Sequence, residues 1–319
     1  MNAFDVFNGD ADGICALHQL RLHEPREAEL VTGVKRDIGL LERLADVSDA
    51  RITVLDISIM TNRAATQGLL ERGCELLYFD HHFAGEPLEH AALEAHIDTS
   101  ADVCTSLLVD RYLDGAYRAW AVTAAFGDNL VKQARAAAKP LDLTAQELEA
   151  LHTLGELLNY NSYGDSLEDL HIPPAELYRS LRGYEHPLTF LSDSLEAENL
   201  LRGFTADMVR ANRSKPIYDG GAGRVFRFPN LVWARRVVGV YANRLSAETP
   251  ERATALVVPN PDGSLRISVR APEERPSGAD TLCMAFPTGG GRTAAAGINQ
   301  LPEADLPKFL EAFQEAFQE

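Results

Sequence analysis

Residues 1–130 alternate short apolar segments with segments of helical periodicity, and this alternation limits the fold more than any other feature. The apolar segments have the length of strands, and the segments between them repeat apolar residues about every third or fourth position. Strands that alternate with helices pair in parallel, because each helix returns the chain to the same end of the sheet. We therefore predict an α/β fold with a doubly wound, mostly parallel sheet. The expected strands are Phe4–Phe7, Leu30–Gly33, Ile52–Leu55 and Glu75–Phe79, and the expected helices are Asp12–Leu22, Leu40–Ala45 and Asn62–Glu71.

The length of 319 residues predicts two domains, at roughly 100–200 residues per domain. We expect a first domain over 1–190, a helical linker over 191–215 and a smaller α/β domain over 216–319. Further helices are expected at Thr105–Leu113, Ala116–Phe126 and Leu143–Asn159, the last beginning with a capping-box sequence at Thr144 and Glu147. In the second domain we expect strands at Gly220–Phe228, Leu231–Val240, Thr254–Pro259 and Leu265–Arg270, a Gly-rich run at Thr288–Gly297 and an acidic helix from Glu303.

The formal net charge of −17 disfavours a protein that coats long duplex nucleic acid, because such binding needs many contacts between basic residues and phosphates. A short anionic substrate is not excluded. The sequence has no apolar stretch of transmembrane length and no basic, apolar leader at its start, so we expect neither a membrane span nor a signal peptide. The four cysteines are far apart, which fits the reducing cytoplasm. The oligomeric state stays open, with a homodimer as one alternative.

Acidic, amide and imidazole side chains follow three of the predicted strands. Since the carboxyl ends of parallel strands meet at one edge of a sheet, these side chains should share one crevice. Crowded carboxylates repel one another unless a cation lies between them, and a set of Asp and His ligands suits Mn²⁺. Two such ions, about 3.5–4 Å apart, can hold a phosphoryl group and activate water. The candidates are Asn8, Asp10 and Asp12 after the first strand, Asp56 after the third, Asp80, His81 and His82 after the fourth, and Asp128 after a later helix.

The order of these motifs resembles the DHH phosphoesterase superfamily. The sequence has D-x-D-G at Asp10–Gly13, a strand-end acid at Asp56, D-H-H at Asp80–His82 and G-D at Gly127–Asp128. The Gly-rich run Gly289–Gly297 is similar to the G-G-H-x-x-A-A-G loop of the DHH-associated substrate domain, and Arg270 matches the strand arginine that precedes that loop. The resemblance extends over nearly the whole chain.

The resemblance implies a metal-dependent phosphoesterase, with two Mn²⁺ ions per chain (Mg²⁺ or Co²⁺ being substitutes) and a cleft between the domains. Asp56 would bridge the ions, His82 would lie near the scissile phosphate, and Arg292 would bind the phosphoryl group as a further catalytic residue. The implied metal ligands are Asn8, Asp10, Asp12, Asp56, Asp80, His81 and Asp128, with Asp80 as a ligand or as a residue that orients one. The implied substrate-binding residues are His82, Arg270, Gly290, Gly291 and Arg292.

The implied substrate is a short phosphorylated oligonucleotide or a nucleotide, as for nanoRNase-like members. An exopolyphosphatase and a binding protein that has lost catalysis are the alternatives. Two positions depart from the family pattern: Asn8 stands where most members have His, and Arg292 stands where the loop has His. An Asn oxygen is a weaker metal ligand than imidazole, whereas Arg retains the ability to bind phosphate. Lys35 and Arg36, after the second strand, are candidates for phosphate contacts or for a solvated strand end.

Overall fold

The computed structural model describes residues 1–318 and divides the chain into two compact units. The first unit covers Met1–Arg202, and the second begins at Gly203. The division falls inside α9 (Leu195–Asn212), which covers most of the segment expected as a helical linker. Within residues 1–318, no helix combines the length and apolarity needed to cross a membrane.

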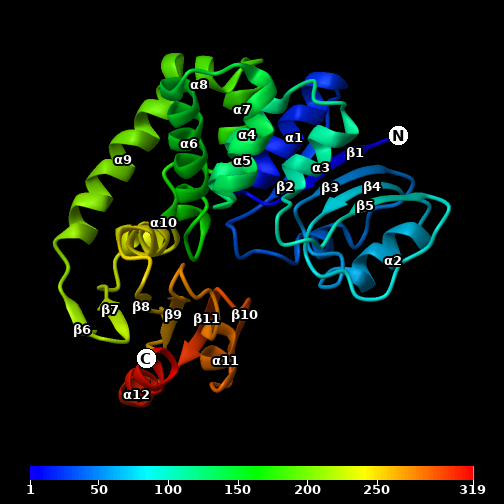
Figure 1. The fold of residues 1–319 in the computed structure, drawn as a ribbon. Coiled ribbons are helices and arrows are strands. Elements are labelled where there is room, and N and C mark those ends of the chain that lie inside the picture. Colours follow the sequence, from blue (N-terminus) through cyan, green and yellow to red (C-terminus); the bar gives the residue numbers. More distant parts are fainter. Residues whose placement is uncertain (319) are drawn as a thin grey trace. The chain divides into compact units, whose positions relative to one another are not determined.

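The first unit contains a five-stranded sheet in which every neighbouring pair is parallel, in the order β2-β1-β3-β4-β5 (Figure 1). The four strands expected from the sequence are present, which confirms the predicted fold class. The edge strand β5 was not predicted, because its sequence LEAHI is half-buried and lacks a clear apolar run. The strand bounds are β1 Ala3–Phe7, β2 Glu29–Thr32, β3 Arg51–Leu55, β4 Glu75–Asp80 and β5 Leu93–Ile97.

Helices cover both faces of this sheet, because alternate side chains of each strand point to opposite faces. On one face, Val6, Val54 and Tyr78 pack with α2 and a short 3₁₀ helix, η1 (Leu40–Leu44), at the segment expected as an α-helix. On the other face, α1 packs with α3 and α4, and nearly every residue of α1 is buried. The helix bounds are α1 Ala11–His23, α2 Arg63–Glu71, α3 Thr105–Tyr112, α4 Arg118–Gly127, α5 Val131–Ala138, α6 Ala145–Tyr160, α7 Pro174–Leu181 and α8 Pro187–Asp193.

The second unit contains a mixed six-stranded sheet, in the order β10-β11-β9-β8-β7-β6. Its pairs are antiparallel except β7 with β8, which is parallel. One face of the sheet packs on α11 (Ala279–Met284) and α12 (Leu306–Phe317) through a core that includes Val257, Ile267 and Phe313. The strand bounds are β6 Pro216–Gly220, β7 Gly223–Arg227, β8 Ala253–Pro259, β9 Leu265–Arg270, β10 Gly289–Gly291 and β11 Ala295–Leu301.

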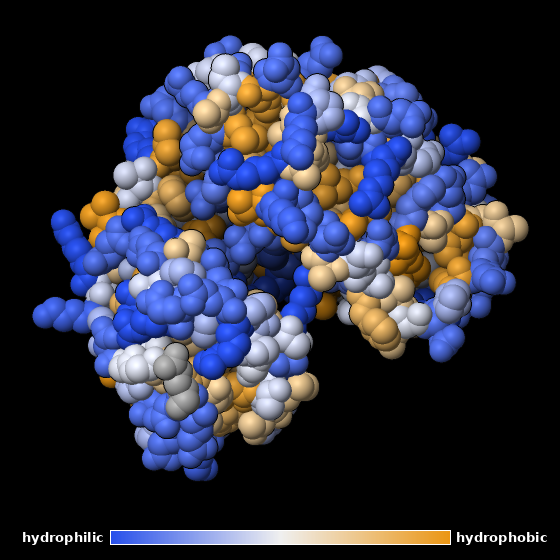
Figure 2. Space-filling view, in the orientation of Figure 1, coloured by the Kyte–Doolittle hydropathy of each residue, from blue (hydrophilic) through white to orange (hydrophobic). Residues whose placement is uncertain are grey.

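The strand predicted at Leu231–Val240 is wrong, because this segment begins the helix α10 (Val232–Glu248). Its many valines favour a strand, but its buried residues recur at helical spacing, as at Ala234, Val238 and Tyr241. The parallel pairing of β7 and β8 also requires a crossover connection of helical length. Figure 2 shows that hydrophilic residues cover most of the visible face of the molecule, with apolar residues scattered between them, as expected when the apolar clusters are internal.

Candidate metal centre

The structure places the predicted acidic and imidazole residues at the carboxyl ends of three neighbouring strands. Asn8 follows β1, Asp56 follows β3, and Asp80 ends β4 directly before His81 and His82. Two groups of side chains are close enough for their ligand atoms to hold one ion, with the atoms of each group within 4.8 Å of one another. The first group is Asp56, His81 and His82, and the second is Asp12, His81 and Asp128.

The D-x-D-G motif fixes two carboxylates through backbone donors. Asp10 caps α1, and its Oδ1 accepts hydrogen bonds from the backbone N–H groups of Asp12 (3.0 Å) and Gly13 (3.1 Å). Both carboxylate oxygens of Asp12 accept hydrogen bonds at 2.7 Å from the first residues of α3, Thr105 and Ser106. A Cβ at Gly13 would lie 2.2 Å from the carbonyl oxygen of Asn8, so the motif requires glycine at this position.

His81 presents one ring nitrogen to the carboxylates. Its Nδ1 lies 2.9 Å from the carbonyl oxygen of Val103, and since a carbonyl can only accept, Nδ1 carries a proton. Nε2 then faces Asp56 Oδ1 at 3.4 Å and Asp128 Oδ2 at 3.8 Å. Burial lowers the pKa of His81, but the carboxylates, Asp56 above all, outweigh burial and raise it to about 10. Without a metal ion, His81 is therefore an imidazolium whose Nε2 must lose its proton to become a ligand.

Asp56 belongs to an acidic cluster with Asp10, Asp12 and Asp128. Its backbone adopts a left-handed conformation (φ 58°), which turns the chain sharply at the end of β3. Its Oδ1 accepts a hydrogen bond from the hydroxyl of Thr105 at 3.4 Å. Burial, followed by the charges of Asp10 and Asp12, raises the pKa of Asp56 well above its ordinary value. Burial and the charge of Asp128 also raise the pKa of Asp12. Burial and the neighbouring carboxylates thus disfavour the ionised forms of Asp12 and Asp56, which is the condition that a bound cation relieves.

Asp80 orients His82. Oδ1 of Asp80 accepts from the backbone N–H of His82 (3.1 Å) and lies 2.7 Å from its Nδ1, while Oδ2 accepts from the backbone N–H of Ile59 (3.2 Å). Asp80 is fully buried, whereas the side chain of His82 is 40% exposed. Burial lowers the pKa of His82, but its hydrogen bond to Asp80 and the charge of Asp56 raise it overall. His82 is therefore a partly exposed imidazole whose protonated form is favoured by its neighbours.

The side chain of Lys35 extends into the acidic cluster. Sequence analysis placed Lys35 after β2 but did not predict this contact with the carboxylates. Its Nζ contacts Asp10 Oδ2 and lies 3.1 Å from Asn159 Oδ1 and 3.4 Å from Asp128 Oδ1. Burial lowers the pKa of Lys35, but the charges of Asp10 and Asp128 outweigh burial and hold this pKa well above its ordinary value. Asn8 contacts the same residue, because its Nδ2 donates to the Lys35 carbonyl at 3.3 Å. The buried Asn8 Oδ1 has no hydrogen-bond partner among residues 1–318.

In the second unit, the predicted substrate-binding residues lie on neighbouring strands. Gly290 and Gly291 belong to β10, which forms a hairpin with β11, and the exposed Arg292 begins the turn between them. Arg270 ends β9, where it pairs with Ala295 of β11, and its Nε donates to Asn243 Oδ1 at 2.9 Å. Gly291 has a φ of 140°, and a Cβ there would lie 2.5 Å from the Cα of the facing β11 residue, so glycine is required in this hairpin. The structure thus brings Arg270 and the Gly-rich segment together.

Comparison with solved structures identifies the fold. The chain resembles a DHH domain described as a member of a family of ribosomal proteins (TM-score 0.63, 14% identity, 98% of this chain and 86% of that one). It resembles RecJ from Thermus thermophilus in complex with Mn²⁺ (TM-score 0.58, 19% identity), covering 98% of this chain and 51% of RecJ. It also resembles PggH, a pGpG-specific phosphodiesterase from Vibrio cholerae (TM-score 0.56, 13% identity, 99% of both chains). The chain has the DHH fold. No family model matches the sequence, and no curated protein matches it significantly.

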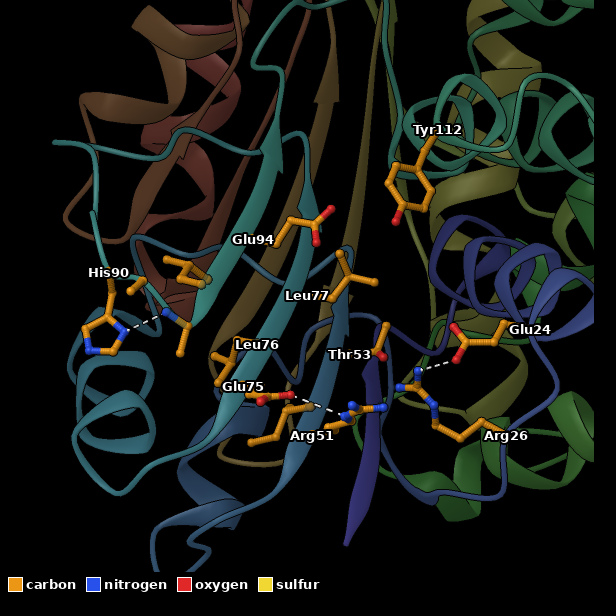
Figure 3. A pocket seen from close by; sticks show the side chains of 14 residues that line it. Glu24, Arg26, Arg51, Thr53, Glu75, Leu76, Leu77, His90, Glu94 and Tyr112 are labelled. Carbon is orange, nitrogen blue, oxygen red and sulfur yellow. Dashed lines mark hydrogen bonds and ion pairs between the residues drawn. The ribbon is translucent and has the colours of Figure 1, made fainter. Parts of the chain in front are cut away.

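A separate cavity of about 580 Å³ lies along the amino-terminal halves of the strands in the DHH-fold sheet (Figure 3). Four of its charged residues pair with one another, since Arg26 contacts Glu24 at 2.8 Å and Arg51 contacts Glu75 at 3.2 Å. The residues that line it include none of the predicted site residues. The candidate chemistry therefore belongs to the opposite, carboxyl-terminal end of the strands, as in other open parallel sheets.

Proposed function

We propose that the chain is a phosphoesterase that depends on a divalent cation and hydrolyses a phosphodiester in short oligonucleotides or small nucleotides. The observation that carries this proposal is the convergence of the carboxylates of Asp12, Asp56 and Asp128 on the imidazole of His81, within ligand distance. The DHH fold supports this proposal. Of the proteins that share it, RecJ has been solved in complex with Mn²⁺, and PggH is a pGpG-specific phosphodiesterase.

The residues present fit a divalent cation. Two possible donor sets share the imidazole of His81, whose Nδ1 proton is fixed by Val103: one adds Asp12 and Asp128, and the other adds Asp56 and His82. Carboxylate and imidazole donors suit Mn²⁺ and also admit Mg²⁺ or Co²⁺. When bound, the cation would neutralise phosphoryl charge and lower the pKa of water. A second ion, as the family resemblance implies, would take Asn8 and Asp10 as ligands, with Asp56 shared. The unpartnered Asn8 Oδ1 supports that ligand role, whereas the contact between Lys35 and Asp10 opposes it.

The remaining residues would bind the substrate. His82, held by Asp80 and partly exposed, would donate a hydrogen bond from Nε2 to a non-bridging phosphoryl oxygen. We assign Arg270 and Arg292 to the substrate's terminal phosphate, since guanidinium groups bind phosphate with two parallel hydrogen bonds. The backbone N–H groups of Gly290 and Gly291 would contribute at the same hairpin. The net charge of −17 favours a short substrate over long duplex nucleic acid.

Exopolyphosphatase activity is the second candidate, and Asn8 favours it. Some exopolyphosphatase-like members of the superfamily that the sequence resembles also carry Asn at this position. The test is product release in the presence of Mn²⁺, measured by chromatography, from pGpG and from polyphosphate side by side. Asp56→Asn should abolish release, while the exposed Asp46→Asn, which removes the same charge elsewhere in the first unit, should leave it unchanged.

Mononucleotide release that disappears in Asp56→Asn would establish a phosphodiesterase. Phosphate release from polyphosphate alone would establish the second candidate instead. Release that survives Asp56→Asn would show that the acidic cluster is not the catalytic site.

A further inference from the structure

Lys35 is a feature of the acidic cluster that the proposed function leaves without a role. Its ammonium contacts Asp10 Oδ2 and lies within 3.4 Å of Asp128 Oδ1. Asp10 is only 2% exposed, and the side chain of Lys35 is 26% exposed. A lysine at a solvated strand end keeps its ammonium in water, whereas this ammonium lies between two of the predicted metal ligands.

The backbone of Lys35 is held on both sides, which fixes the point from which the side chain extends. Its N–H donates to the carbonyl of Ser162 at 2.9 Å, and its own carbonyl accepts from Asn8 Nδ2 at 3.3 Å. Its Nζ also donates a hydrogen bond to Asn159 Oδ1 of α6 at 3.1 Å. The aromatic ring of Tyr163 lies near it, 5.8 Å from Nζ to the ring centroid. Partners from three separate segments thus surround one ammonium group.

We propose that the Lys35 ammonium takes the place of one of the two cations in this cluster, so that the chain binds a single divalent cation. This inference rests on the proposed function, because it assumes that Asp12, Asp56, His81 and Asp128 hold the ion that is bound. An ammonium that contacts Asp10 and a divalent ion bound by the same carboxylate would repel each other at a distance of about one hydrogen bond. Only one of the two can occupy that position.

Asn8 belongs to the same arrangement. An imidazole at this position would offer a strong ligand to an ion beside Asp10, whereas the amide uses its Nδ2 to hold the backbone of Lys35. The departure at Asn8 and the position of Lys35 therefore have one explanation. A fixed ammonium supplies positive charge at Asp10 without exchanging with cations in solution. The activity should accordingly follow the occupancy of one ion, with no further dependence on a second.

The test counts ions on the full chain after chelator treatment and titration with Mn²⁺. Equilibrium dialysis followed by elemental analysis gives the number of ions per chain, and electron paramagnetic resonance tells an isolated Mn²⁺ ion, with its resolved hyperfine sextet, from a spin-coupled pair. We expect one isolated ion in the wild-type protein. The double variant Asn8→His/Lys35→Ala should bind two ions and give a coupled spectrum, while Lys132→Ala, which removes an exposed lysine of α5, should behave as the wild type.

Two ions with a coupled spectrum in the wild type would overturn the inference, because Lys35 would then move aside on binding. A double variant that is folded by circular dichroism and still binds one ion would also overturn it. These results leave the proposed phosphoesterase intact. Binding of no ion by the wild-type protein would instead reject the proposed function and the inference together.

Discussion

Binding of a divalent cation should release a proton from His81, and the affinity should rise steeply with pH. In the metal-free protein the pKa of His81 is about 10, against 6.5 for an unperturbed imidazole. At pH 7 the ring is almost fully protonated, and removing the proton from Nε2 costs about 4 kcal/mol, at about 1.36 kcal/mol for each pH unit below the pKa. Each pH unit gained should therefore strengthen binding about tenfold, or about 100-fold between pH 6 and pH 8.

The direction of this pH dependence follows from which protonation state of His81 binds the ion. Below the pKa of His81 the imidazolium has no lone pair to offer, so acid weakens binding, and the raised pKa values of Asp12 and Asp56 act in the same direction. The assay is titration calorimetry with Mn²⁺ in two buffers that differ in ionisation enthalpy, which yields the number of protons released. We expect about one proton per ion at pH 7.

A matched pair of variants separates His81 from other histidines. His81→Gln should bind the ion more weakly and release a different number of protons, because the ring that loses its proton is gone. His96→Gln, which removes a partly exposed histidine paired with Glu94, should release the same number of protons as the wild type. An affinity that stays constant from pH 6 to pH 8, or proton release in His81→Gln that equals that of the wild type, would refute this account of the site.

Three further perturbations test the structure. Burial lowers the pKa of His18 to about 4. The neutral ring therefore stabilises the fold above pH 6.5, and this contribution, about 3 kcal/mol, is lost as the pH falls towards 4. In His18→Gln, the free energy of unfolding measured with urea should fall less over this pH range. Arg21→Met should lower the free energy of unfolding by about 3–5 kcal/mol, because it leaves Asp5, 2.9 Å from Arg21 Nε, as a buried unpaired charge, and Asp5→Asn in the same chain should recover part of that loss. Asp80→Asn should keep the ion stoichiometry but shift the loss of activity at alkaline pH to a lower pH, because His82 loses the partner that raises its pKa; an unchanged pH profile of kcat/KM would contradict the role given to Asp80.

The sequence was sufficient to predict four strands of the first sheet and the residues at their ends, because both depend on local patterns. Apolar runs of strand length place Asp56 and Asp80 at the ends of β3 and β4, and the parallel order then brings these ends together. The edge strand β5 and the helix α10 were not predicted correctly. In β5 the apolar pattern is weak, and in α10 the local preference of valine for strands is overridden by the crossover that joins β7 to β8.

The position of Lys35 could not be predicted from local patterns, because its environment is assembled from distant parts of the chain. Asn159 and Asp128, which approach its ammonium, lie 124 and 93 residues away in sequence. A side chain with several rotatable bonds can point to solvent or into the sheet edge, and the contacts of the ammonium with residues distant in the sequence select the second direction. The same limitation applies to Asp12, whose donors in α3 are 93 and 94 residues distant.

The donors and acceptors that orient the ligands of the metal centre are mostly backbone groups, and this has a consequence for how such a site diverges in evolution. Asp12 is held by the N–H groups of residues 105 and 106, His81 by the carbonyl of residue 103, and Asp80 by the N–H of residue 59. Almost any amino acid except proline can supply these N–H donors, so substitutions can accumulate around the ligands without moving them. Such a centre can keep its geometry after most of the surrounding sequence has changed, which is consistent with a shared fold at 13–19% identity.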